Sequence, residues 1–316
     1  MLNRRIIRIK VFKVLYSIIN SGEWTPQDAQ KRLTAHCEGT RDLYCFTMNV
    51  LPALRKRAAD LADKRMHKHF PTEEELHPNM RFINNRFILM LENNAKFCDY
   101  CSGKSLEWSW CEEENDRHYA FIKNMFDRIE ESAYHQDYMT SDEDSLEADC
   151  NFVVSILQNE FEDNDDFETV VDEFRIPLWT DDIGYVLNCA INDVSKYAKS
   201  SQFSLPRVFS STADESFAKQ LLSGSILNYK DYSDLIAANT ANWDADRIVP
   251  TDISLIVMGI TEAVSFPDIP VKVTINEYVD ISKYYSTPNS RIFVNGLLDK
   301  IIQQKINSGE ITKDKE

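Results

Sequence analysis

The chain has 316 residues, 43% of them hydrophobic, with only 8 Gly and 10 Pro. This length can bury the cores of two domains, and the scarcity of turn residues excludes a many-turned β-sandwich, so we expect an all-α protein. The formal net charge of −16 disfavours nucleic acid as a partner of the whole chain, but the charge is unevenly distributed. Residues 1–70 carry 14 Lys and Arg against 6 Asp and Glu, residues 71–200 carry 10 against 30, and residues 201–316 carry 11 against 15. The acidic excess therefore lies mainly in the middle of the chain.

The amino-terminal stretch MLNRRIIRIKVFKVLYSIIN does not predict a signal peptide, because Arg8, Lys10 and Lys13 interrupt its apolar core. No apolar run approaches the roughly eighteen residues that a membrane span requires. The seven cysteines are irregularly spaced and indicate reduced thiols rather than a disulfide framework. We therefore expect a cytoplasmic protein with no membrane partner.

The first predicted helix covers residues 3–20, where Ile7, Val11 and Val14 recur at helical spacing. Arg4 and Arg8 are an i, i+4 pair on one flank of this helix, beside Arg5. Thr25 and Pro26 then predict the start of a short second helix. A long helix is expected over residues 41–69.

The middle of the chain predicts helices separated by acidic clusters. After the loop FPTEEELHPN, helices are expected at residues 79–101, 115–135, 141–161, 166–174 and 180–199. The clusters SDEDSLEAD and EFEDNDDFE fall at helix starts or between helices, where carboxylates suit the helix dipole. They are either a solvated surface or a docking face for a basic partner.

A polar linker, SSQFSLPRVFSSTADES, precedes four predicted helices at residues 214–240, 250–265, 270–285 and 288–307. The last of these contains Asn295 and Gly296, two residue types that weaken a helix interior. We predict that Gly296 is a point of close packing and that Asn295 caps or braces the neighbouring loop.

Four motifs in order resemble the NusB family: NWDADRI, an apolar helix, IPVKVTINEYVDISKYYS and NSRIFVNGLLDKI. At the amino terminus, NRRIIRIKVFKVLYSI is similar to the arginine-rich first helix of that family. The resemblance covers about a third of the chain. It implies a NusB-like helical bundle of two antiparallel subdomains, which is discontinuous and formed by residues 1–20 and 205–316, with an acidic helical region inserted at residues 21–204.

The resemblance also implies a function. NusB proteins are non-enzymatic bacterial transcription antitermination factors that bind boxA RNA with the ribosomal protein NusE, in the antitermination complex of RNA polymerase. No cofactor and no small-molecule substrate are implied. The RNA-binding positions suggested by the resemblance and by residue chemistry are Arg4, Arg5, Arg8, Tyr16, Lys272, Asn289, Ser290, Arg291 and Phe293. For NusE, the resemblance suggests Tyr16 and Asp252.

Residue chemistry supports the RNA interpretation of the first helix, since arginine forks bind phosphate and tyrosine rings stack on unpaired bases. Tyr16 lies eleven residues after Arg5, which is close to three helical turns, so the two share a flank. The alternative is that three arginines at a helix start form a solvated face.

The sequence also allows three other interpretations. Cys98, Cys101, Cys111 and His118 form a candidate zinc site, but a lone CxxC pair can equally be buried at a helix end. An enzyme is disfavoured because the chain lacks a glycine-rich phosphate loop, a nucleophile elbow and HExxH. The stronger alternative is an interaction scaffold that uses the acidic region, with RNA binding reduced or lost.

Overall fold

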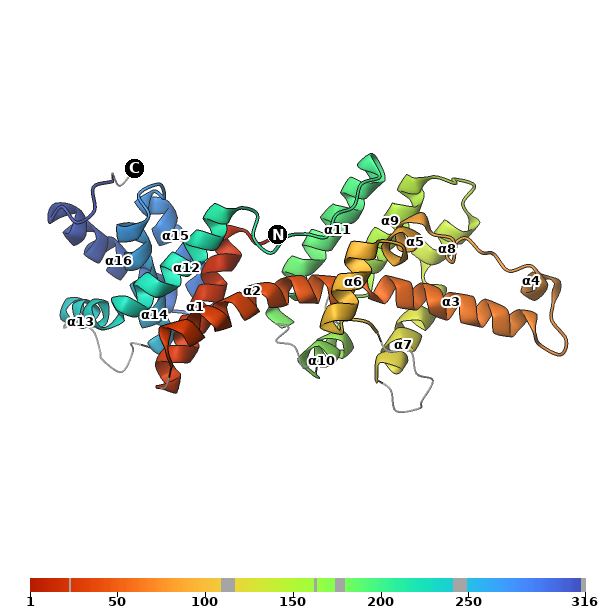
Figure 1. Ribbon diagram of the computed structural model, residues 1–316, viewed down its shortest axis with the longest axis horizontal. Helices are drawn as coiled ribbons and strands as arrows, with labels where there is room; N and C mark the ends of the chain where they lie inside the picture. Colours follow the sequence, from red (N-terminus) through yellow and green to blue (C-terminus); the bar gives the residue numbers. More distant parts are fainter. Residues whose placement is uncertain (23, 109–116, 162–163, 174–179, 241–248, 314–316) are drawn as a thin grey trace. The chain divides into compact units, whose positions relative to one another are not determined.

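The computed structural model describes the chain except residues 23, 109–116, 162–163, 174–179, 241–248 and 314–316 (Figure 1). The described residues form α-helices and one 3-10 turn, with an isolated β-bridge between Leu2 and Phe209 and no strand. The predicted all-α class is therefore confirmed. In the described part of the chain, no helix is long and apolar enough to cross a membrane.

The chain divides into two compact units. The terminal unit consists of Leu2–Cys37 and Phe209–Glu316, and the middle unit consists of Met1 and Glu38–Val208. The boundaries of these units fall near residues 37 and 208, whereas the sequence predicts domain boundaries near 20 and 204. That the residues between the two parts of a NusB-like domain are an insertion stays a prediction.

The helices of the terminal unit are α1 (Arg4–Ser21), the first half of α2 (Pro26–Met48), α12 (Thr212–Leu227), α13 (Tyr229–Asn239), α14 (Pro250–Ser265), α15 (Val271–Tyr285) and α16 (Ser290–Asn307). Helix α14 is apolar over most of its circumference and is the buried centre of the unit, packed against α1, α12, α15 and α16. Asn3 caps α1 by accepting a hydrogen bond from the Ile6 amide at 3.0 Å, and Gly22 ends it in the left-handed region.

Two glycines permit close packing around α14. A Cβ atom on Gly259 would lie 2.7 Å from Leu298 Cδ2, and one on Gly224 would lie 2.8 Å from Thr261 Cγ2. At Gly296 a Cβ would meet nothing within 4 Å, and the residue is exposed. The prediction that Gly296 is the close-packing glycine is therefore wrong.

The helices of the middle unit are the second half of α2, then α3 (Val50–Met66), α4 (Glu73–Leu76), α5 (Arg86–Glu92), α6 (Ala95–Lys104), α7 (Arg117–Glu131), α8 (Ala133–Thr140), α9 (Leu146–Asn159), α10 (Asp165–Glu173), η1 (Thr180–Asp182) and α11 (Ile183–Ser200). Its core is rich in aromatic rings: Trp108 stacks on Phe46 at 4.5 Å and donates its indole hydrogen to the Phe46 carbonyl oxygen.

Several predicted helices are divided in the structure, and the second helix is 23 residues long rather than short. The predicted helix at 79–101 is interrupted where Asn94 caps α6 by accepting a hydrogen bond from the Phe97 amide. The predicted helix at 115–135 is interrupted where Ser132 caps α8. Both caps occur inside runs of otherwise suitable helical periodicity, so periodicity alone did not reveal them.

Candidate nucleic-acid interface

Arg8 is buried and forms the centre of a polar network inside the terminal unit. Its Nε and Nη2 atoms donate to the two carboxylate oxygens of Glu262 on α14, at 2.7 and 2.8 Å. Thr274 and Tyr278 on α15 donate to the same carboxylate at 2.8 and 3.1 Å. Burial opposes the charge on Arg8, but the hydrogen bond and the charge of Glu262 raise its pKa overall. Arg8 therefore joins three helices in the interior and is not presented to a ligand.

Arg4 and Arg5 are partly exposed, and both have acidic partners in the same unit. Arg5 binds Glu277 in a bidentate pair at 2.9 and 2.8 Å and contacts Asp280 at 3.1 Å. Arg4 lies 3.4 Å from Asp214. A phosphate that binds either arginine must compete with these carboxylates.

Tyr16 belongs to an aromatic group at the other end of α1. Tyr16 is 36% exposed, and its ring lies 6.1 Å from the ring of Phe12. The Phe12 ring in turn lies 5.7 Å from the ring of Tyr285 at the end of α15. Lys13 Nζ lies 5.3 Å from the centre of the Tyr285 ring. Sequence reasoning missed Lys13 and Tyr285, although Lys13 lies three residues before Tyr16 and so shares its flank. Tyr284, which precedes Tyr285 on α15, is exposed.

The start of α16 separates into an exposed and a buried side. Asn289, Arg291 and Ile292 are exposed, and Arg291 makes no ion pair with any described residue. Ser290 and Phe293 are buried. Only Asn289 and Arg291 of the predicted positions here are therefore presented to solvent, and Ile292 is an exposed neighbour that the sequence did not identify.

Asp252 is also buried, at the start of α14. It accepts hydrogen bonds from Ser286 Oγ at 2.6 Å and from Ser290 Oγ at 2.7 Å. Asp252 and Ser290 thus brace the turn between α15 and α16 against α14. Burial raises the pKa of Asp252, although the two hydroxyls lower it.

We expect Ser290→Ala to lower the free energy of unfolding by about 1–3 kcal/mol at neutral pH, because the Asp252 carboxylate loses a donor. A raised carboxyl pKa means that the folded state takes up a proton more readily than the unfolded state. Once Asp252 is protonated, the free-energy cost of burying its negative charge is absent. The loss should therefore shrink toward pH 4. Urea unfolding at both pH values measures it, with Ser308→Ala as the control at the far end of α16 that should change little at either pH.

Lys272 is exposed but distant from the aromatic group. It lies thirteen residues before Tyr285 on α15, which is about 20 Å along the helix. The structure therefore brings Tyr16 near the α15 end but does not bring Lys272 to the same place.

Gly296 lies one turn after Ile292 on the exposed side of α16. Because its Cβ would meet nothing, Gly296→Ala should raise the free energy of unfolding by about 1 kcal/mol through helix propensity alone. Gly259→Ala is the matched comparison and should be destabilising, since its Cβ would meet Leu298. Thermal or urea unfolding measures both, and an equal effect of the two substitutions would contradict this account.

The candidate zinc ligands that the structure describes contact groups other than one another. Cys98 and Cys101 lie on α6, where Cys101 is buried and Cys98 Sγ is 3.3 Å from the Glu92 carbonyl oxygen. The His118 ring lies 5.0 Å from that of Trp108. Cys111 lies outside the described residues, and among those that are described no group of three or more His, Cys, Asp or Glu could hold a metal.

The helices from α11 to α16 match a known protein family. A family model described as "NusB family" matches residues 187–303, from within α11 to within α16. The chain is 36% identical over 97 residues to the transcription antitermination protein NusB of Salinibacter ruber, covering 31% of this chain and 61% of the relative. It is 38% identical over 92 residues to that of Thermodesulfovibrio yellowstonii, covering 29% and 61%.

A third relative is matched more completely. The chain is 35% identical over 95 residues to the transcription antitermination protein NusB of Finegoldia magna, covering 30% of this chain and 69% of the relative. The chain belongs to the NusB family. It spans 61% of the length of the Salinibacter and Thermodesulfovibrio proteins, and no solved structure matches it.

Proposed function

We propose that this protein is a transcription antitermination factor that binds boxA-type single-stranded RNA together with NusE and performs no catalysis. The observation that carries the proposal is the family match, because it covers the helices α12 to α16 and includes the exposed start of α16. Relatives matched over this region are named transcription antitermination proteins.

The proposed RNA surface centres on Tyr16, Lys13, Tyr285 and Arg291. Tyr16 offers an exposed ring on which an unpaired base can stack. Arg291 lies at the start of α16, where the helix dipole favours a phosphate. Its guanidinium has no acidic partner among the described residues, so RNA binding there breaks no ion pair with them. This distinguishes Arg291 from Arg4 and Arg5.

The other predicted positions take different roles in this proposal. Arg4 and Arg5 are secondary phosphate contacts that exchange their carboxylate partners for RNA, and Asn289 adds a polar contact beside Arg291. Arg8, Ser290 and Phe293 support the surface from within the core. Lys272 lies too far along α15 to join the same contact.

For the protein partner, we keep Tyr16 as a candidate contact with NusE because its ring is accessible. Asp252 instead supports the turn before α16 from a buried position. The RNA polymerase antitermination complex is the proposed setting in which both partners meet, as the family resemblance implies.

Binding of a labelled boxA RNA and of a scrambled RNA, with and without purified NusE, tests the proposal. The expected results are a preference for boxA RNA, stronger binding with NusE, and affinity that falls with salt as phosphate contacts require. Equal binding of the two RNAs together with no effect of NusE would contradict the proposal and favour the scaffold alternative.

A further inference from the structure

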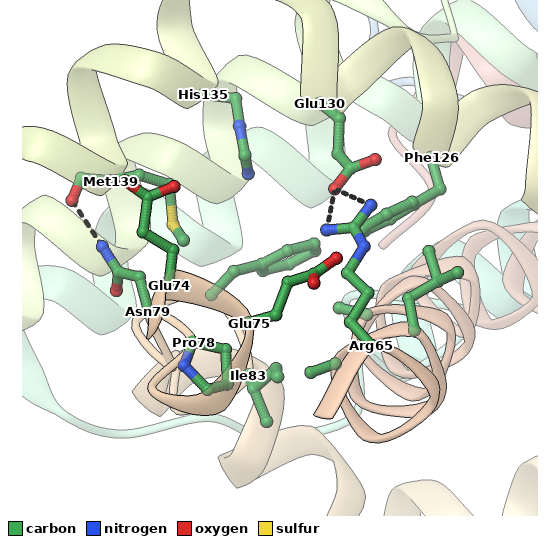
Figure 2. Close-up of a pocket in the computed structure, with 14 residues that line it drawn as sticks. Arg65, Glu74, Glu75, Pro78, Asn79, Ile83, Phe126, Glu130, His135 and Met139 are labelled. Carbon is green, nitrogen blue, oxygen red and sulfur yellow. Dashed lines mark hydrogen bonds and ion pairs between the residues drawn. The ribbon is translucent and has the colours of Figure 1, made fainter. Parts of the chain in front are cut away.

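The middle unit contains a cavity of about 350 Å³ between α3, α4, α7 and α8 (Figure 2). Its floor is apolar: the rings of Phe82 and Phe126 are nearly parallel with their centres 6.0 Å apart, and Ile83 and Ala62 lie beside them. All four residues are buried. The size is at the small end for ligand sites, which suits one large side chain better than a nucleotide.

Carboxylates from two helices surround the mouth of this cavity (Figure 2). Glu130 on α7 pairs with Arg65 on α3 at 3.3 Å, and Glu75 on α4 pairs with Lys68. Glu74 on α4 is exposed, lines the cavity, and has no ion pair with any described residue. One carboxylate at the mouth is therefore free to receive a cation.

His135 adds no positive charge to this mouth at neutral pH. Its ring points toward the cavity and meets the ring of Phe82 edge-on, with centres 6.2 Å apart. Burial lowers the pKa of His135, and the nearby charge of Glu130 only partly opposes this shift. The neutral ring presents one donor and one acceptor beside an apolar floor.

The chain segment that carries α4 also carries exposed apolar side chains. Phe70, Leu76 and Met80 are 87%, 43% and 40% exposed, and they are all of the exposed large apolar side chains in the described part of the middle unit. They occur on the segment that carries α4, and Glu74, Glu75, Pro78 and Asn79 of this segment line the cavity. Apolar surface concentrated beside a pocket is typical of a protein-binding site.

We propose that this cavity binds a basic peptide segment of a partner protein, which inserts one large apolar side chain onto Phe82 and Phe126. A Lys or Arg of the same segment meets Glu74, and Phe70, Leu76 and Met80 cover the flanking residues of the peptide. The positive charge of the partner follows from the mouth, where the carboxylates Glu74, Glu75 and Glu130 outnumber the cations Arg65 and Lys68. Residues 71–200 add to this field, since they carry 30 Asp and Glu against 10 Lys and Arg. This proposal does not depend on the RNA proposal for the terminal unit.

The test uses the full chain with selectively labelled methionine methyl groups. A short Lys-rich peptide with one central Phe is titrated in and followed by NMR and fluorescence anisotropy. Met139 lines the cavity and the exposed Met80 follows the lining residue Asn79, so both methyl signals should shift, whereas the buried Met258 of the terminal unit should not. The same peptide with Ala in place of Phe should bind at least about tenfold more weakly.

Two variants locate the site. Ala62→Phe fills the floor and should weaken peptide binding about tenfold or more, while Glu74→Lys should weaken it about threefold to tenfold by repelling the cation. Glu73→Lys is the matched control, because Glu73 is exposed on the same short helix but does not line the cavity. Glu74→Lys lies on the surface, so the test stands even if Ala62→Phe fails to fold.

The following outcomes would overturn the proposal. These are absence of measurable binding, equal weakening by Glu73→Lys and Glu74→Lys, and equal affinity for a peptide with Glu in place of every Lys. Displacement of the Met80 and Met139 signals by an RNA rather than by the basic peptide would also refute it.

Discussion

Glu262→Gln is expected to lower the free energy of unfolding of the terminal unit by about 3–5 kcal/mol. The substitution removes the charged partner that accepts both hydrogen bonds from the buried Arg8 guanidinium, and leaves only Glu277 at 3.6 Å from Nη1. It also weakens the acceptor used by Thr274 and Tyr278. The side chains of the pair are 4% and 0% exposed, so water cannot replace the lost partner. Hydrogen exchange of the α1 and α14 amides, together with urea unfolding, measures the loss.

Two companion variants show whether the effect belongs to this pair. Arg8→Met combined with Glu262→Gln should recover part of the stability, because the uncompensated charge is removed as well. Glu277→Gln alters a partly exposed carboxylate that also contacts Arg5 and should change stability by no more than about 1 kcal/mol. A similar loss from Glu277→Gln and Glu262→Gln would mean that burial of the pair is not what stabilises the unit.

The double variant Tyr16→Ala with Arg291→Ala should weaken binding of boxA RNA about thirtyfold. Loss of a stacking ring reduces binding by about 1–3 kcal/mol, and loss of one phosphate contact lowers the salt dependence by somewhat less than one unit for a single strand. Fluorescence anisotropy across a salt series gives both quantities in one experiment.

Lys272→Ala is the charge-matched control for this measurement. Lys272 is exposed on the same unit but lies about 20 Å along α15 from Tyr285, so its removal should have little effect. If Lys272→Ala weakened binding as much as the double variant, the RNA surface would have to lie along the start of α15 instead.

The sequence predicts the all-α class well because helical periodicity and caps are local signals. It fails for Arg8, whose spacing from Arg4 suggests a shared exposed flank. Arg8 is buried because it pairs with Glu262, which lies 254 residues away, and no local sequence pattern predicts that contact. The same reasoning applies to the buried Asp252 and Ser290, which looked like exposed residues at helix starts.

The glycines show the same limit in another form. Gly259 and Gly296 both lie inside helices, and the local sequence does not indicate which of them is closely packed. Only Gly259 faces another helix, where Leu298 leaves no room for a Cβ. The placement of Arg291 in the first turn of a helix, by contrast, could be predicted, because a helix start is a local feature. Its contact with RNA stays a prediction.

The Arg8–Glu262 pair also has a consequence for the order in which the protein folds during synthesis. Arg8 leaves the ribosome 254 residues before its partner, a delay of about 13–50 s at typical bacterial and eukaryotic elongation rates. Residues 38–208 of the middle unit are all made within this interval and can fold first, which shortens the effective loop between α1 and α14. Until then α1 exposes its apolar stripe, so pulse-labelling of nascent chains should find α1 protected only after α14 has emerged.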